Sequence, residues 1–168
     1  MKNKFLNKIY LIIILILFSF TANAEENKNI NEHQINAFVG NFDFSDNKQK
    51  AILVGFQHQN ENLERDTFLG NISPITGGFL TENSAAYIYT GVEWNYAIGD
   101  KLKFTPSFAP GIYHEGNGKD LGHALEFKTE VQASYSVSGS TSIGMSYNHI
   151  SNASLGDKNP GANSYMFN

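Results

Sequence analysis

The sequence contains no cysteine. Without thiols the chain has no disulfide framework, no cysteine-ligated zinc site and no lipid-modified N-terminal cysteine. Basic residues are also scarce, since Arg65 is the single arginine and 12 lysines and arginines stand against 16 acidic residues. Contacts to the phosphates of a nucleic acid require clustered lysine and arginine. The composition therefore argues against a nucleic-acid partner.

Long apolar runs are confined to the N-terminus. Three lysines precede an unbroken apolar run over residues 9–17, and the sequence Ala22-Asn23-Ala24 and two glutamates follow it. A positive region, a short apolar core and a small-x-small cleavage pattern are typical of a secretory signal. About 20 apolar residues would be needed for a membrane-spanning helix. We therefore predict a signal peptide over residues 1–24 and a single exported domain over residues 25–168.

Most of the remaining chain alternates apolar and polar residues with a period of two, which is typical of β-strands. Between Leu125 and Val137, for example, one face is mainly apolar and the other carries Glu126, Lys128 and Glu130. The pattern predicts eight strands, at about residues 35–44, 50–60, 67–80, 85–98, 101–113, 124–137, 140–151 and from 163 onward.

Two architectures accommodate this alternation. A soluble sandwich or barrel buries its apolar face, whereas a transmembrane barrel turns that face toward lipid and its polar face inward. Export, strands close to the 9–11 residues that a tilted spanning strand needs, and aromatic residues near strand ends favour the membrane version. The predicted fold is an eight-stranded antiparallel transmembrane β-barrel of the outer membrane.

The connections between the strands differ in length at the two ends of this barrel. The two-residue turns at 99–100 and 138–139 fall at one end, and the longer connections 114–123 and 152–162 fall at the other. Short periplasmic turns and long external loops are the outer-membrane pattern. Only residues 163–168 remain for the last strand, so we expect either a truncated final strand or a barrel that closes poorly.

The seventh predicted strand ends with two residues that suit acyl-transfer chemistry. His149 and Ser151 are two positions apart, so their side chains point to the same, lipid-facing side. An imidazole and a hydroxyl at that place could act as general base and nucleophile on an acyl chain, or could lie in the headgroup zone without any chemical role. His-x-Ser alone is a weak motif.

A longer segment around this pair carries a resemblance. The run His149-Ile150-Ser151-Asn152-Ala153, the polar loop after it and Asn163-Ser164-Tyr165 resemble the lipid A 3-O-deacylase (PagL) family, and the similarity covers about residues 100–168. The resemblance implies an eight-stranded outer-membrane barrel that acts on lipid A with no cofactor, with its active site toward the outer leaflet.

The resemblance implies roles for individual residues. Ser151 matches the nucleophile and His149 the general base. Asn159 matches an asparagine that helps to bind the oxyanion, together with a backbone N–H near Ser154. The family's glutamate, twelve residues after the serine, falls on Asn163 here.

The asparagine at 163 is a departure from the family pattern. The third member of such a triad orients the imidazole and stabilises its charged form, and a neutral amide does only the first. Asp157 would supply a carboxylate if its loop folded back toward His149. We therefore keep a catalytically silent structural barrel as an alternative to the esterase, and a periplasmic soluble barrel that binds an apolar ligand as another.

The other histidines give no indication of a metal centre. They occur singly and without metal-ligand spacing, so the sequence predicts no metal or cofactor: His33, His58, His114 and His123. The expected partners are lipid A and the lipid of the outer membrane, and the sequence leaves both a monomer and a homodimer open.

Overall fold

A computed structural model describes residues 33–46 and 49–168. The predicted signal peptide, residues 1–24, lies outside the described residues. The elements in chain order are β1 (His33–Phe42), β2 (Ala51–Asn60), a 3₁₀ turn (Glu61–Leu63), β3 (Arg65–Thr67), β4 (Gly70–Thr81), β5 (Ala86–Ile98), β6 (Leu102–His114), β7 (Leu125–Ser138), β8 (Thr141–Ser151) and β9 (Ala162–Phe167). None of the helical turns within the described residues is long and apolar enough to cross a membrane.

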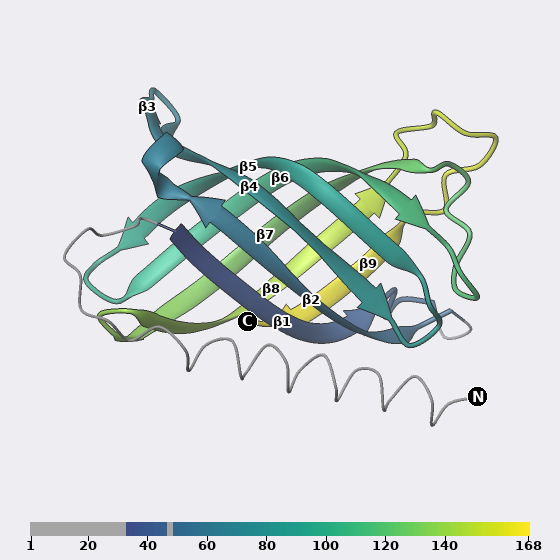
Figure 1. The fold of residues 1–168 in the computed structure, drawn as a ribbon, viewed down its shortest axis with the longest axis horizontal. Coiled ribbons are helices and arrows are strands. Elements are labelled where there is room, and N and C mark those ends of the chain that lie inside the picture. Colours follow the sequence, from purple (N-terminus) through teal and green to yellow (C-terminus); the bar gives the residue numbers. More distant parts are fainter. Residues whose placement is uncertain (1–32, 47–48) are drawn as a thin grey trace. The chain divides into compact units, whose positions relative to one another are not determined.

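Eight of the strands form a closed antiparallel barrel (Figure 1). They are hydrogen-bonded in the order β2-β1-β9-β8-β7-β6-β5-β4, and pairing between β2 and β4 completes the ring. The short strand β9 pairs with β8 over Met145–Ile150 and with β1 over Val39–Asn41. The prediction of an eight-stranded barrel is confirmed, and the ring is closed despite the short last strand.

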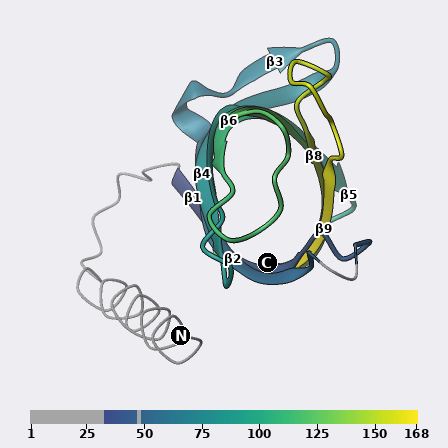
Figure 2. The ribbon, with the colours of Figure 1, turned by 90° about the vertical axis from the view of Figure 1, so that its right-hand side faces the viewer.

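Strand β3 lies outside the ring (Figure 2). It pairs only with the first residues of β4, where Arg65 stands opposite Ile72, whereas the later part of β4 pairs with β2. The ring of Phe68 at the tip of this small hairpin is 97% exposed. The connection after β2, which fits the simple pattern of short turns poorly, is thus an added hairpin at the end of the barrel opposite the long loops.

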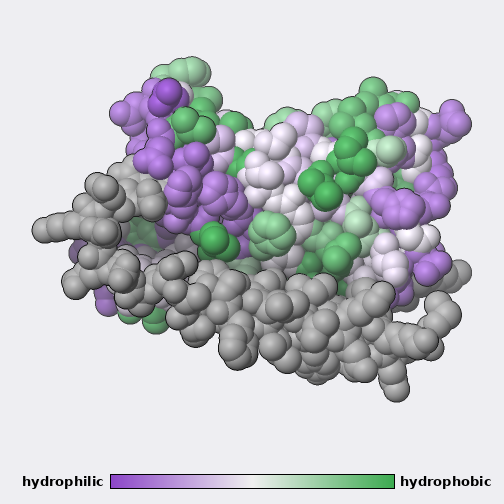
Figure 3. All heavy atoms as spheres, in the orientation of Figure 1, coloured by the Kyte–Doolittle hydropathy of each residue, from purple (hydrophilic) through white to green (hydrophobic). Residues whose placement is uncertain are grey.

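The outer wall of the barrel is apolar, whereas its interior holds many polar side chains. Large apolar side chains point outward along every wall, among them Ile52, Phe56, Ile88, Phe108, Ile112 and Met145. The interior instead holds buried polar side chains, among them Gln57, Glu93, Lys128, Glu130 and Asn148. In Figure 3 hydrophobic residues lie on the outer wall between more hydrophilic ends. This distribution is that of a membrane barrel and contradicts the soluble-barrel alternative.

Hydrogen bonds and ion pairs satisfy much of this polar interior. The Lys128 ammonium lies 3.1 Å from a carboxylate oxygen of Glu130 and 4.1 Å from the centre of the Tyr89 ring. The Gln57 amide donates to Glu93 at 2.9 Å, and the Tyr89 hydroxyl donates to Gln57 at 3.0 Å. Burying a charge is costly unless the charge is paired in this way. The interior of the barrel thus combines this polar network with a buried apolar cluster that includes Phe42, Leu53 and Tyr87.

A closed barrel with an apolar wall predicts a specific behaviour in membranes. We expect the full-length protein to fractionate with outer membranes and to migrate faster on gels in dodecyl sulfate before heating than after it, since hydrogen bonding around a closed ring resists the detergent. Differential centrifugation and unheated gels measure both properties. Recovery as a soluble periplasmic species would contradict the outward orientation of the apolar faces.

Candidate active site

His149 and Ser151 lie at the end of β8 that carries the long loops. The burial of β8 alternates there, because Ser146, Asn148 and Ile150 point into the barrel and the residues between them point outward. His149 and Ser151 are both half-buried on the outward side. The two side chains thus share one face at the rim of the lipid-facing wall, as the sequence predicts.

Asn163 is the partner of the His149 imidazole. Strand β9 pairs with β8 so that Asn163 stands opposite His149, and its Oδ1 lies 2.8 Å from His149 Nδ1. Because an amide oxygen can only accept, this contact places the proton on Nδ1 and leaves the lone pair of Nε2 free. The Tyr147 hydroxyl donates to the same Oδ1 at 2.8 Å. Asp157 is exposed on its loop and makes no contact with His149 in the described part of the chain.

The turn after β1 holds Asn163 from its other side. The Asn163 side-chain amide donates from Nδ2 to Ser45 Oγ at 3.3 Å, and its backbone N–H donates to Asp43 Oδ1 at 3.4 Å. Asn163 in turn accepts at its backbone oxygen from the N–H of Phe44 at 3.0 Å. No sequence pattern indicates these contacts, because Ser45 and Asn163 are 118 residues apart.

The loop that follows Ser151 is organised by Asn152, which is fully buried. Its Nδ2 donates to the backbone oxygens of Leu121 and Lys158 at 2.8 and 2.9 Å, and its backbone N–H donates to Asn159 Oδ1 at 3.1 Å. The Ser154 N–H donates to Asn152 Oδ1 at 2.9 Å. Asn159 therefore keeps its own NH₂ as a donor, whereas the Ser154 N–H is already engaged within the loop. Sequence reasoning missed this role of Asn152, although the residue belongs to the quoted run.

The β6–β7 loop lies over the opening of the ring at this end (Figure 2). Its Lys119 reaches across to the turn after β1, where the ammonium lies 2.6 Å from Asp43 Oδ2. The loop also carries Asp120, which forms an ion pair with Lys158 at 2.5 Å. The hydrogen bond from Lys158, with a second from the N–H of Gly122, holds the pKa of the Asp120 carboxyl below its usual value. The two long loops are thus fastened to each other.

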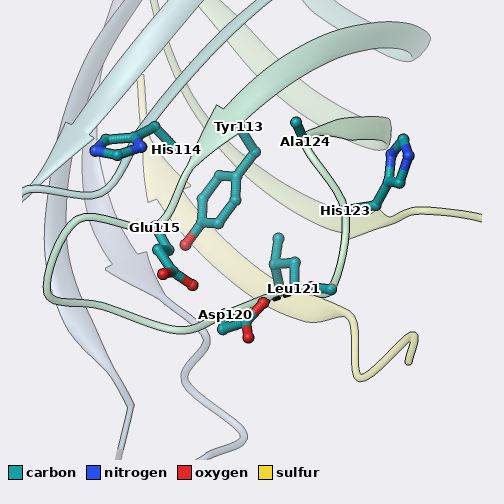
Figure 4. Close-up of a pocket in the computed structure, with 8 residues that line it drawn as sticks. Tyr113, His114, Glu115, Asp120, Leu121, His123 and Ala124 are labelled. Carbon is teal, nitrogen blue, oxygen red and sulfur yellow. Dashed lines mark hydrogen bonds between the residues drawn. The ribbon is translucent and has the colours of Figure 1, made fainter. Parts of the chain in front are cut away.

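A small cavity of about 310 Å³ lies within the β6–β7 loop. The side chains of Tyr113, Glu115 and Leu121 approach one another in its centre, whereas His114 and His123 are displaced to its two sides (Figure 4). In the described part of the chain, no three histidine, aspartate or glutamate side chains are grouped so that they could hold a metal ion.

Aromatic side chains flank the rim on both sides of the His149–Ser151 pair. Phe127 stands opposite Ser151 on β7 and stacks on Phe108, with ring centres 6.0 Å apart. On the other side the ring of Phe44 packs against the rings of Tyr147 and Tyr165, at 6.2 and 5.3 Å. The half-exposed hydroxyl of Ser151 thus lies beside an apolar surface that can contact an alkyl chain.

Gly161 lies against the His149 imidazole and leaves no room there for a side chain. Its φ is +61°, and a Cβ added there would lie 2.8 Å from His149 Cε1 and 3.4 Å from His149 Nε2. Gly161→Ala should therefore strain the backbone and displace the imidazole. If His149 is the general base of the esterase that the sequence predicts, ester hydrolysis should fall about tenfold or more, with the barrel intact. An assay of ester hydrolysis by the folded, unheated variant measures this loss. Near-normal activity would show that the imidazole does not act from its observed position.

The chain is similar to known proteins both in sequence and in fold. The family model described as lipid A 3-O-deacylase (PagL) matches residues 57–168. A solved structure entitled "Crystal structure of the outer membrane enzyme PagL" superposes with a TM-score of 0.58 at 20% identity, covering 80% of this chain and 95% of that chain. At this identity the superposition shows a shared fold. No curated protein sequence matches the chain.

Proposed function

The chain belongs to the lipid A 3-O-deacylase (PagL) family, and from this premise we propose that it is a serine esterase that removes an ester-linked 3-hydroxyacyl chain from lipid A. Ser151 is the proposed nucleophile and His149 the proposed general base. Asn163 is the third member, which orients the imidazole. The observation that carries the proposal is the 2.8 Å contact from His149 Nδ1 to Asn163 Oδ1, which leaves Nε2 basic on the face that carries Ser151.

Acylation begins with proton transfer to His149. Nε2 takes the proton of the Ser151 hydroxyl as Oγ attacks the carbonyl carbon of the ester, and the carbonyl π electrons move to oxygen. The tetrahedral intermediate then collapses, and the imidazolium gives its proton to the departing sugar oxygen. The products of this half-reaction are the free sugar hydroxyl and an acyl chain bound to Ser151.

Donors in the loop after β8 would stabilise the negative oxygen of the tetrahedral intermediate. Asn159 has an NH₂ group for this purpose, since within residues 33–46 and 49–168 its side chain is engaged through Oδ1, by the N–H of Asn152. A backbone N–H near Ser154 is the second proposed donor, and the Ser154 N–H would serve once substrate displaces its bond to Asn152. Fixed donors directed at a developing oxyanion typically contribute a factor of about 10² to 10³ in rate.

Deacylation uses the same groups, with water in the place that the Ser151 hydroxyl takes in acylation. His149 takes a proton from water, the resulting hydroxide adds to the acyl carbon, and the bond to Ser151 Oγ breaks. Ser151 recovers its proton from the imidazolium and the fatty acid leaves. One water is consumed for each ester bond that is cleaved.

The position of the site suggests how the substrate reaches it. Ser151 and His149 lie on the outer wall, beside Phe127 and Tyr147, so an acyl chain would approach sideways through the membrane. We place the loop-bearing end, and with it the site, toward the outer leaflet, because long loops are typical of the external end of such barrels. A deep pocket is then unnecessary.

Mass spectrometry of lipid A tests the proposed function. Lipid A incubated with the purified, folded protein should lose the mass of one 3-hydroxyacyl chain, and free 3-hydroxy fatty acid should appear in equal amount. Lipid A that remains intact with the folded protein present would favour the catalytically silent barrel, in which the neutral amide of Asn163 is insufficient.

A further inference from the structure

The turn after β1 contacts the side-chain amide of Asn163, whose two ends are not equivalent. A carboxylate presents two equivalent acceptors to an imidazole, whereas an asparagine amide presents an acceptor at one end and a donor at the other. If Asn163 turned its NH₂ toward His149, Nδ1 would have to accept and the proton would move to Nε2. Such an imidazole cannot take a proton from Ser151.

Ser45 and Asp43 determine which end of the amide faces His149. The Ser45 hydroxyl donates to Asp43 Oδ1 at 3.4 Å, because a carboxylate can only accept. With its proton engaged there, Ser45 Oγ faces Asn163 as an acceptor, 3.3 Å from Nδ2. Only the NH₂ end of the amide can meet it, so Oδ1 is directed toward His149 Nδ1.

Asp43 is itself held firmly. Its carboxyl group is buried, its Oδ2 binds the ammonium of Lys119 at 2.6 Å, and its backbone oxygen accepts from the N–H of Asp46 at 3.0 Å. The φ of Asp43 is +50°, which turns the chain so that Ser45 comes back toward the first residues of β9. The chain of contacts therefore runs from Lys119 through Asp43 and Ser45 to Asn163 and His149.

We propose that Ser45, with its hydroxyl proton held by Asp43, is a positioning residue that fixes the orientation of the Asn163 amide and thereby the Nδ1–H tautomer of His149. This inference rests on the proposed esterase function. It assigns a role to a turn at the opposite end of the sequence from the His-x-Ser run. Ser45 touches neither the substrate nor the reacting atoms, and acts only through Asn163.

A double substitution separates this role from a merely structural one. Ser45→Ala should lower the rate of deacylation at least twofold and up to about tenfold in the native background, because the amide then populates both orientations and the rate falls with the fraction of molecules that keep Nδ1–H. In an Asn163→Asp background the same change should alter the rate less than about twofold, since a carboxylate needs no orienting. Ser45→Thr, which keeps the hydroxyl, should retain activity, and Ser140→Ala at the opposite end of the barrel is the matched control.

Nitrogen NMR gives a readout independent of turnover. In protein labelled with ¹⁵N-histidine, the His149 signals, identified by their absence in His149→Ala, should report Nδ1–H in the native protein and a mixture with Nε2–H in Ser45→Ala. An equal rate loss in both backgrounds, or an unchanged tautomer, would overturn the proposal. If Ser45→Ala is fully active while Ser151→Ala is inactive, only this inference fails. If Ser151→Ala is itself active, the proposed esterase function fails.

Discussion

Replacement of Ser151 by alanine should abolish deacylation of lipid A. The change removes the only protein atom that bonds to the acyl carbon in the proposed mechanism, and loss of a nucleophile lowers turnover by at least about 10³-fold. Folding should be unaffected, because Ser151 lies half-buried at the end of β8 and fills no core. The measurement is lipid A mass spectrometry with protein shown to be folded by its migration on unheated gels.

His149→Ala should match Ser151→Ala within experimental error, and the double substitution should be no worse than either. Residues that act as one unit are strongly non-additive, because the first loss already removes the step that they share. Ser140→Ala, an exposed turn residue, controls for handling of the protein. Substantial deacylation by either single variant would show that the nucleophile or the base is another residue.

Replacement of Asn163 by aspartate should raise turnover. The observed geometry favours aspartate over the family's glutamate as the first test, because aspartate has the shape of asparagine and preserves the 2.8 Å contact to His149 Nδ1. A carboxylate fixes the same tautomer and also stabilises the imidazolium that forms during attack. In a half-buried site we expect a gain on the order of 10-fold to 10²-fold.

The surroundings of Asn163 can accept the added charge. Asp43 accepts from the backbone N–H of Asn163, but Lys119 at 2.6 Å offsets its charge, and the Tyr147 hydroxyl already donates to the position of Oδ1. Asn163→Glu should also be active, with a smaller gain, because its longer side chain must retract to reach the same point. Asp157→Asn should leave the rate unchanged, since Asp157 is exposed and does not contact His149. A loss of activity in Asn163→Asp with an unchanged Asp157→Asn would show that catalysis requires the amide itself.

The strands and their orientation follow from local pattern. A side-chain period of two fixes which residues share a face, so Glu126, Lys128 and Glu130 could be assigned to the interior before any contact was known. The same periodicity places His149 and Ser151 together on the outer wall. Export and loop length then favour a membrane barrel over a soluble one. For such features each residue's environment is determined by its neighbours in the chain.

The surroundings of the imidazole were decided by tertiary structure alone. The resemblance points to Asn163, but only the pairing of β9 with β8 brings its Oδ1 to His149, and only ring closure brings Ser45 and Asp43 to Asn163. Contacts across more than a hundred residues depend on the register in which distant strands meet, and no short stretch of sequence encodes that register. The sequence by itself thus determined which faces meet lipid and which residues could react, whereas closure of the barrel determined the hydrogen bonds that surround Asn163 and His149.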